Sequence, residues 1–271
     1  MIIDAHTHIR VDIPNYAADR KNVYGIVSSG PDEYLAQYRR NGVDACFTFG
    51  QESFRNASVA MAENEALSAV QRQYPARIYA WATVCPGLPE AQLRRDIRQA
   101  IMQFKLRGLK FVPICQGIAL SSRGMAIVAE EAIALNVPVT THDGSPEYSS
   151  AIQVVYYARK YPELRVLSAH SGLRELWPDF LDAVMELPNL YLCLSGPTQW
   201  GLQKLYDTLG PEKLLFGSDG GLGHPAVITA YLRRIEHLKA PAEHKTMILG
   251  TNALRFIRGE YNPKLTAKSL S

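Results

Sequence analysis

The chain has 271 residues, of which 47% are hydrophobic and 20% charged, and its formal net charge is +3. A hydrophobic fraction of this size supplies a substantial core and excludes a disordered or fibrous chain. The weak net charge and the lack of a lysine- and arginine-rich run argue against a nucleic-acid partner. No run of about 18 apolar residues occurs, so the sequence predicts no membrane span.

The cysteines and the first residues bear on the compartment. Cys46, Cys85, Cys115 and Cys193 are scattered without the spacing of a metal-binding or redox pair. In a chain of this size they are typical of free thiols in a reducing compartment. The amino terminus, MIIDAHTH, has no basic segment followed by an apolar stretch, so we expect no signal peptide and a cytoplasmic location.

Short apolar runs alternate with longer amphipathic stretches along the chain, which predicts strands that alternate with helices. The runs are mostly apolar on both faces, as in parallel strands that are covered on both sides. The expected strands are Ile2–Ala5, Ala45–Phe49, Ile78–Val84, Leu109–Ile114, Val137–Thr141, Arg165–Ala169, Leu190–Leu194 and Leu214–Ser218. The expected helices are Pro31–Arg40, Val59–Gln73, Glu90–Phe104, Arg123–Leu135, Glu147–Arg159, Leu176–Glu186, Gly201–Leu209 and Ala226–Leu238.

Eight strand–helix units with short connections predict a closed barrel. An open doubly wound sheet usually has fewer strands, and a (β/α)8 barrel takes about 250 residues. We therefore predict an α/β fold, a single (β/α)8 TIM barrel with parallel strands, as one domain over residues 1–271. The connection from about residue 9 to residue 29 is long for a compact domain, and such loops often serve as lids.

Two histidines, His6 and His8, lie two residues apart at the end of the first expected strand. Side chains two apart on a strand point to the same face, so both imidazoles can project into the barrel mouth. Neighbouring neutral imidazole nitrogens form a site for a divalent transition metal. Asp4 shares that face, and we expect its carboxylate to hydrogen-bond the other ring nitrogen of a ligand histidine.

Three more polar side chains each end an apolar run. His142 ends the fifth expected strand, His170 the sixth and Asp219 the eighth. The carboxyl ends of barrel strands meet at one rim, where barrel enzymes hold their active sites. The pattern therefore predicts that these three side chains and the two histidines of the first strand meet around one metal ion.

The order of these residues resembles that of the amidohydrolase superfamily, and the amidohydrolase-2 (amidohydrolase-related) family is the best match. The phrases that carry the resemblance run from residue 3 to residue 256 and are IDAHTH, GLKFVP, AHSG, LFGSD and GTNALRF. That family includes hydrolases, lactonases and non-oxidative decarboxylases.

The resemblance implies a ligand set and two catalytic residues. His6, His8, His142 and Asp219 would ligate one divalent metal ion, commonly zinc, although manganese, iron and cobalt accept the same donors. Asp219 would be the general base toward a metal-activated water and then the acid that protonates the leaving group. His170 would lie next to the metal and hydrogen-bond the oxyanion that develops on the substrate.

Lys110, in the fourth expected strand, allows three interpretations. It could be a carboxylated lysine that bridges two metals, as in other branches of the superfamily. It could also be an inward cation that contacts an acidic group of the substrate, or a member of a buried ion pair. TatD-type nucleases also begin with an HxH pattern, but they usually place a glutamate on the fourth strand, and none is found here.

Candidate substrate-binding residues lie in the same loops. Arg10 and Lys110 near the barrel mouth suit an anionic substrate, and Trp200 follows the seventh expected strand. Further polar residues of these loops, for which no role is assigned, are Asp143, Glu147, Tyr148, Ser195, Gln199 and His224.

These observations predict a metal-dependent hydrolase that cleaves a C–O or C–N bond of an ester, lactone or amide in a small, anionic molecule. The alternative is a metal-dependent non-oxidative decarboxylase that acts on an aromatic or unsaturated carboxylic acid. The expected partner is the small-molecule substrate, without nucleic acid or membrane, and the resemblance leaves open whether the protein is a homodimer.

Overall fold

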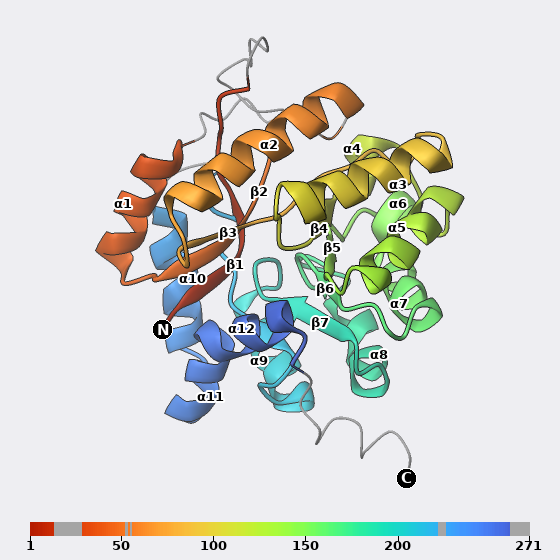
Figure 1. The fold of residues 1–271 in the computed structure, drawn as a ribbon. Helices are drawn as coiled ribbons and strands as arrows, with labels where there is room; N and C mark the ends of the chain where they lie inside the picture. The colour runs from red at the N-terminus through yellow and green to blue at the C-terminus, as the bar shows by residue number, and fades with distance from the viewer. Residues whose placement is uncertain (14–28, 52–53, 55, 222–225, 261–271) are drawn as a thin grey trace.

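Eight parallel strands lie in the part of the chain that the computed structural model describes, which is residues 1–13, 29–51, 54, 56–221 and 226–260 (Figure 1). The strands are β1 (Ile3–His8), β2 (Ala45–Phe49), β3 (Ile78–Ala80), β4 (Leu109–Phe111), β5 (Val139–Thr141), β6 (Val166–Ser168), β7 (Leu190–Cys193) and β8 (Leu214–Leu215). Each includes or overlaps one of the expected strands, and most are shorter than the apolar run that predicts them.

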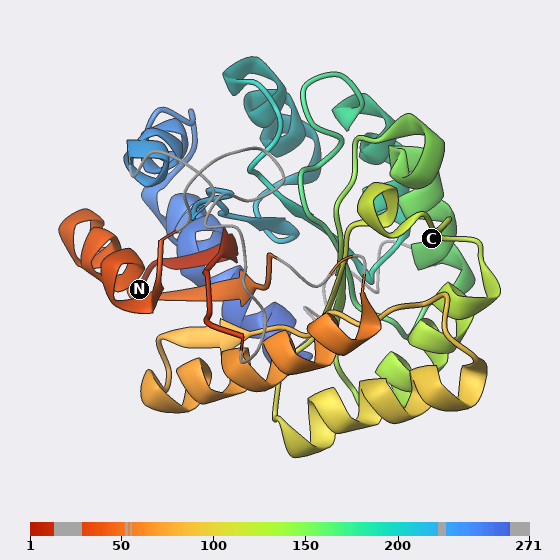
Figure 2. The ribbon, with the colours of Figure 1, turned by 90° about the horizontal axis from the view of Figure 1, so that it is seen from above.

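The strands form two parallel sheets that join into one barrel. β1, β2 and β3 form a three-stranded sheet, and β4 to β8 form a five-stranded sheet in sequence order. The two sheets meet at two places, and an isolated β-bridge joins them at each. Ala82 pairs with Leu109 between β3 and β4, and Thr7 pairs with Gly220 between β1 and the residues after β8. Seen from above, the strands lie inside a ring of helices (Figure 2). The predicted (β/α)8 barrel is confirmed.

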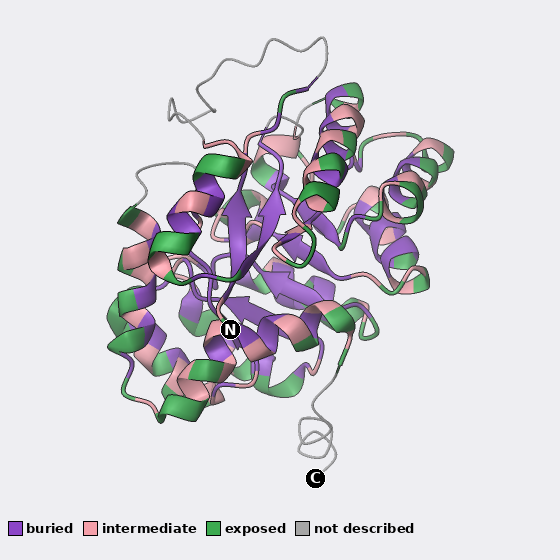
Figure 3. Cartoon of the chain, turned by 60° about the vertical axis from the view of Figure 1, so that its left-hand side comes forward, coloured by how far each residue is buried: buried purple, intermediate pink, exposed green. Residues whose placement is uncertain are grey.

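The helices cover the outside of the barrel and turn their exposed residues away from it (Figure 3). The helices that follow strands are α1 (Pro31–Asn41), α2 (Ala57–Gln73), α3 (Glu90–Arg98), α4 (Pro113–Gln116), α5 (Arg123–Ala134), α6 (Pro146–Ser149), α7 (Ala151–Lys160), α8 (Leu181–Glu186), α9 (Gln199–Leu209) and α10 (Ala226–Glu236). A π-helical turn, η1 (Gln99–Gln103), extends α3, and a 3₁₀ turn, η2 (Trp177–Phe180), precedes α8.

Local capping explains where one expected helix divides. The Ser150 side chain accepts a hydrogen bond from the backbone amide of Gln153, and the backbone amide of Ser150 donates one to the side-chain oxygen of Gln153. This reciprocal capping satisfies amides that a helix start leaves unpaired. The helix expected over 147–159 is therefore two helices, α6 and α7, with Ser150 between them.

Three helical segments that the sequence pattern did not predict follow α10 in the described residues: α11 (Ala242–Thr246), the π-helical η3 (Met247–Thr251) and α12 (Asn252–Arg258). Phe256 of α12 stacks on Trp81 with ring centroids 6.3 Å apart and meets Tyr191 edge-on at 4.9 Å. These rings belong to the apolar cluster that fills the barrel interior. The last helix thus seals one end of the barrel and leaves the opposite end for polar side chains.

The turn after β8 admits only glycine at position 221. Gly221 has a φ of +92°, and a Cβ there would lie 1.6 Å from the carbonyl oxygen of His8.

Gly221→Ala is expected to cost about 3 kcal/mol or more of folding free energy, because left-handed strain adds to a backbone clash. Urea unfolding measures the loss. Gly117→Ala is the matched control, since Gly117 also has a positive φ of +62° but no heavy atom within 4 Å of a Cβ. Equal losses for the two variants would contradict the clash.

Candidate metal centre

Three side chains from three strand ends converge at the carboxyl end of the barrel. The donor atoms of His6, His170 and Asp219 all lie within 4.8 Å of one another. His6 Nε2 is 3.3 Å from Asp219 Oδ1, and the rings of His6 and His170 have centroids 4.7 Å apart. These residues end or follow β1, β6 and β8, as the strand-end pattern predicts.

The other two predicted side chains lie beside these three. His8 Nε2 is 3.3 Å from His6 Nε2 and 3.5 Å from Asp219 Oδ1. His142 lies one step further, with its Nδ1 2.9 Å from His170 Nε2. We call His6, His8, His142, His170 and Asp219 the histidine–aspartate cluster. The structure brings all five together, and His170 rather than His142 belongs to the group whose donor atoms all lie within 4.8 Å of one another.

Hydrogen bonds on the far side of each ring orient the imidazoles. His6 Nδ1 lies 3.2 Å from the carbonyl oxygen of Ala169, and His8 Nδ1 lies 3.3 Å from that of Gly50. A carbonyl only accepts, so Nδ1 carries the proton in both rings. The unprotonated Nε2 of each ring then faces the cluster, which is the arrangement that a metal ion requires.

A serine holds the third ring in the same way. The Ser195 hydroxyl donates to the carbonyl of Ala169 over 2.8 Å and lies 2.9 Å from His170 Nδ1. Because the hydroxyl proton is already used, Ser195 accepts from His170 Nδ1. His170 Nε2 is thereby left unprotonated and faces His142.

Burial keeps the imidazoles of His6, His142 and His170 neutral. It lowers the pKa of His6 well below its usual value, with the Lys110 cation adding to the effect. It also lowers the pKa of His170, and the pKa of His142 to about 2. Burial opposes ionisation of Asp219, but the surrounding histidines hold the pKa of its carboxyl well below the usual range. Neutral imidazoles beside a carboxylate are the protonation states that bind a divalent metal.

Comparison with known proteins places the chain in a family. The model of the amidohydrolase family matches residues 3–259. The chain belongs to the amidohydrolase family. This match covers every strand described above and confirms the resemblance seen in the sequence.

Solved structures share the fold of this amidohydrolase at low sequence identity. A 5-carboxyvanillate decarboxylase from Novosphingobium aromaticivorans, complexed with manganese and 4-hydroxy-3-methoxy-5-nitrobenzoic acid, is 12% identical with a TM-score of 0.73, covering 95% of this chain and 96% of that chain. A 4-oxalomesaconate hydratase from Rhodopseudomonas palustris is 19% identical with a TM-score of 0.70, covering 99% and 98%. A probable 2-pyrone-4,6-dicarboxylic acid hydrolase from Acinetobacter baumannii is 16% identical with a TM-score of 0.69, covering 95% and 99%.

No curated protein sequence matches this amidohydrolase. In the described residues, no helix combines the length and the apolar character that crossing a bilayer requires.

Lys110 of β4 points into the barrel beside the cluster. Its side chain is only 1% exposed, its Nζ lies 3.4 Å from His6 Nε2, and it stands 4.7 Å from the centroid of the Phe49 ring. Burial lowers the pKa of Lys110 to about 8, although the nearby charges of Asp219 and Asp143 oppose the shift. Among the described residues no carboxylate lies within ion-pair distance of Nζ. Within the described residues, Lys110 therefore forms no buried ion pair.

A buried ammonium without a carboxylate partner is costly to fold. Lys110→Met is expected to leave the free energy of unfolding of the metal-free protein unchanged or to raise it by about 1 kcal/mol. Chemical denaturation measures this quantity. Lys213→Met is the matched control, because burial also lowers the pKa of Lys213 to about 8 but its Nζ donates to the carbonyls of Val184 and Leu187. The control is expected to lose stability, and a larger loss for Lys110→Met would contradict the account.

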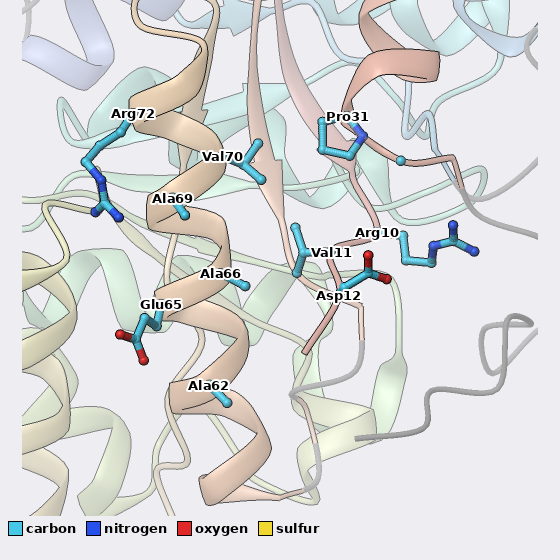
Figure 4. Close-up of a pocket in the computed structure, with 11 residues that line it drawn as sticks. Arg10, Val11, Asp12, Pro31, Ala62, Glu65, Ala66, Ala69, Val70 and Arg72 are labelled. Atoms are coloured by element: carbon cyan, nitrogen blue, oxygen red, sulfur yellow. The ribbon is translucent and has the colours of Figure 1, made fainter. Parts of the chain in front are cut away.

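Arg10 and Trp200 make no described contact with the cluster. Arg10 lines a pocket of about 580 Å³ between α2 and the segments 10–12 and 30–31, and none of the described residues that line it belongs to the cluster (Figure 4). Trp200, at the start of α9, is 63% exposed and meets Trp177 edge-on at 5.3 Å. Substrate binding by these two residues stays a prediction. His224 and most of the expected lid, residues 14–28, lie outside the described residues.

Asp143 has a role at the site that the sequence analysis does not assign. It is fully buried, and its two carboxylate oxygens accept the backbone amides of His170, over 2.8 Å, and of Gly172. Its position after the fifth strand is the only sequence signal for this role. Asp143 thus fixes the backbone that carries His170.

Phe49, the last residue of β2, contacts the cluster in a way that the sequence does not predict. Its ring meets those of His6 and His8 edge-on, with centroids 5.0 Å and 5.6 Å away. The aromatic ring places His6 in a low-dielectric setting, in which burial is the largest cause of its lowered pKa. An apolar residue at a strand end gives no sequence signal of such a contact.

The expectation for Asp4 is wrong in its detail. Its carboxylate accepts the backbone amides of His6 and Ser218 and the hydroxyls of Tyr38 and Ser218, and no ring nitrogen. The pairing of β1 with β2 shifts register between Asp4 and Thr7, so simple alternation does not place Asp4 beside the imidazoles. Burial raises the pKa of Asp4 to about 6 against these hydrogen bonds, which lower it.

Proposed function

We propose that the protein is a metal-dependent hydrolase that cleaves the C–O or C–N bond of an ester, lactone or amide in a small, anionic molecule. The observation that carries the proposal is the convergence of neutral imidazole nitrogens and one ionised carboxylate at the carboxyl end of the barrel. Active sites of (β/α)8 enzymes lie at this end. The family includes enzymes that act on such bonds, as the resemblance implies.

The donor set fits a single divalent ion. Imidazole and carboxylate donors suit zinc, and they also accept manganese, iron or cobalt. In this proposal His6, His8, His142 and Asp219 would hold the ion. Because the donor atoms of His170 lie close to those of His6 and Asp219, His170 is the alternative ligand to His142. A divalent ion bound there would lower the pKa of water from ~15.7 to about 7 and so supply hydroxide at neutral pH.

The side chains of the cluster then perform the proton transfers. Asp219 stays ionised at neutral pH because its pKa is low, so it can accept a proton from the attacking water. The same low pKa makes the protonated carboxyl a ready donor to the leaving group. His170, held by Ser195, would hydrogen-bond the oxyanion that develops on the attacked carbonyl once its Nε2 has taken up a proton.

Lys110 is the best-supported substrate contact. It is the buried cation next to the cluster, and an anionic group of the substrate would neutralise a charge that no carboxylate of the described residues pairs. Arg10 and Trp200 remain proposed contacts at the loops that follow β1 and β7.

Metal analysis and a substrate screen test the proposal. We expect the purified protein to hold about one equivalent of metal and to hydrolyse a member of a panel of lactones, esters and amides that carry a carboxylate. Activity should disappear with a chelator and return with zinc or manganese. Hydrolysis that survives complete metal removal would contradict the proposal.

A decarboxylase is the second candidate. A structure with the same fold is a 5-carboxyvanillate decarboxylase that was solved with manganese, and Lys110 would equally suit a carboxylic acid substrate. Release of carbon dioxide from an aromatic acid, with no hydrolysis across the panel, would favour this candidate over the hydrolase.

A further inference from the structure

The carboxylate of Asp4 joins the two chain segments that carry His6 and Asp219. Asp4 lies on β1 and is fully buried. Its Oδ1 accepts the backbone amide of His6 over 3.2 Å and the backbone amide of Ser218 over 2.9 Å. The hydroxyl of Ser218 donates to Oδ2, so Ser218 is bound by both carboxylate oxygens. Residues that are 214 apart in sequence are thus fixed to one side chain.

The segment that Asp4 holds is a turn in an unusual conformation. Asp219 has a φ of +53°, a left-handed backbone that residues other than glycine rarely adopt. Such a conformation costs of order 1 kcal/mol and persists only when its surroundings determine it. The Ser218 hydroxyl, itself bonded to Asp4, accepts the amide of Gly220 over 3.1 Å and so spans the strained residue.

The same turn is tied to β1 on its other side. The amide of Asp219 donates to the carbonyl of His6 over 2.9 Å, and the amide of His8 donates to the carbonyl of Gly220 over 2.8 Å. Together with the bonds of Asp4, these contacts set the 3.3 Å separation between His6 Nε2 and Asp219 Oδ1. Removing the Asp4 carboxylate leaves the buried amides of His6 and Ser218 without their acceptor and frees the turn to relax.

We propose that Asp4 is a positioning residue, which holds the Ser218–Gly220 turn in its left-handed form so that Asp219 and His6 present their donor atoms to one divalent metal ion. The inference rests on the proposed function for the identity of the ligand. In this role Asp4 acts through backbone amides and a turn, and not through a hydrogen bond to the ring of a ligand histidine. Substituting residues that orient metal ligands typically weakens metal binding about 10- to 100-fold.

Zinc titration of four proteins tests the proposal. The proteins are the wild type, Asp4→Ala, Asp4→Asn and Tyr38→Phe, each held well below its own melting temperature. Asp4→Ala is expected to bind zinc about 10- to 100-fold more weakly. Asp4→Asn should recover most of the affinity, because an amide oxygen can still accept both backbone amides and its NH₂ group can donate to hydroxyls that rotate.

Tyr38→Phe is the matched control. The Tyr38 hydroxyl donates to Asp4 Oδ2 over 3.0 Å from α1, so this variant removes a buried hydrogen bond from the same carboxylate without touching the turn. It is expected to lower the melting temperature and to leave zinc affinity unchanged. Wild-type affinity in Asp4→Ala, or an equal loss in Tyr38→Phe, would overturn the positioning role.

Crystal structures of the metal-free wild type and Asp4→Ala separate this inference from the proposed function. If the wild type binds no zinc, the proposed function fails, and the turn itself decides the role of Asp4. We expect Asp219 in Asp4→Ala to leave the left-handed region and its Oδ1 to move away from His6 Nε2. An unchanged turn would refute the inference. Should Asp4→Ala not fold, Ser218→Ala removes the hydroxyl bonds alone and must still displace Asp219.

Discussion

Asp219→Asn is expected to lower the turnover number about 100- to 10,000-fold while the protein keeps most of its metal. Asparagine has nearly the shape of aspartate, so the three imidazoles and the amide oxygen can still surround an ion. The amide cannot accept a proton from water, however, and the proton transfer loses its base. Steady-state kinetics on a hydrolysed substrate and metal analysis of the same preparation measure the two quantities.

The surface provides a control for this change. Asp207 is exposed on α9 and accepts a hydrogen bond from Gln203, and Asp207→Asn is expected to keep wild-type turnover. Full activity in Asp219→Asn would remove this residue from the acid–base role. Loss of the metal together with the activity would show that Asp219 acts mainly as a ligand.

His6→Ala and His142→Ala are expected to reduce bound metal from about one equivalent to a small fraction of it. Both rings are neutral in the fold, because burial lowers their pKa, so each offers a nitrogen without first releasing a proton. His170→Ala is expected to retain metal and to lose turnover, since its proposed role is to stabilise an oxyanion. Metal analysis after gel filtration in metal-free buffer distinguishes the three variants.

His237→Ala is the control for nonspecific losses. His237 lies exposed directly after α10, and its ring bonds the carbonyl of Arg233, so its replacement should leave metal content unchanged. If His142→Ala keeps its metal and His170→Ala loses it, His170 takes the place of His142 in the proposed ligand set. The 2.9 Å contact between the two rings makes this the sharpest test of that assignment.

The sequence predicts the residues of the cluster well because strand ends are readable. His142 and His170 each end an apolar run, and the carboxyl ends of parallel strands meet at one rim of the barrel. Both residues are therefore predicted to lie at that rim. The alternation of side chains along a strand likewise places His6 beside His8. Local periodicity and a closed barrel suffice for both inferences, and the structure places the five side chains close together.

Contacts between distant segments could not be predicted in this way. Because the register of β1 shifts between Asp4 and Thr7, the alternation of side chains along a strand does not predict where Asp4 points. Its partner Ser218 lies 214 residues away in the sequence. The role of Asp143 depends on backbone amides that the sequence does not reveal. For Lys110, only the structure shows that no described carboxylate reaches its amine. Arg10 follows His8 closely in sequence, yet it lines a pocket to which no described residue of the cluster contributes.

Anomalous diffraction from a crystal grown with zinc or manganese tests the central claim most directly. The account predicts one strong peak at the carboxyl end of the barrel, about 2.0–2.2 Å from His6 Nε2, His8 Nε2 and an oxygen of Asp219. A protein that carries its metal elsewhere, or a cluster whose side chains contact no ion at saturating metal, would contradict it.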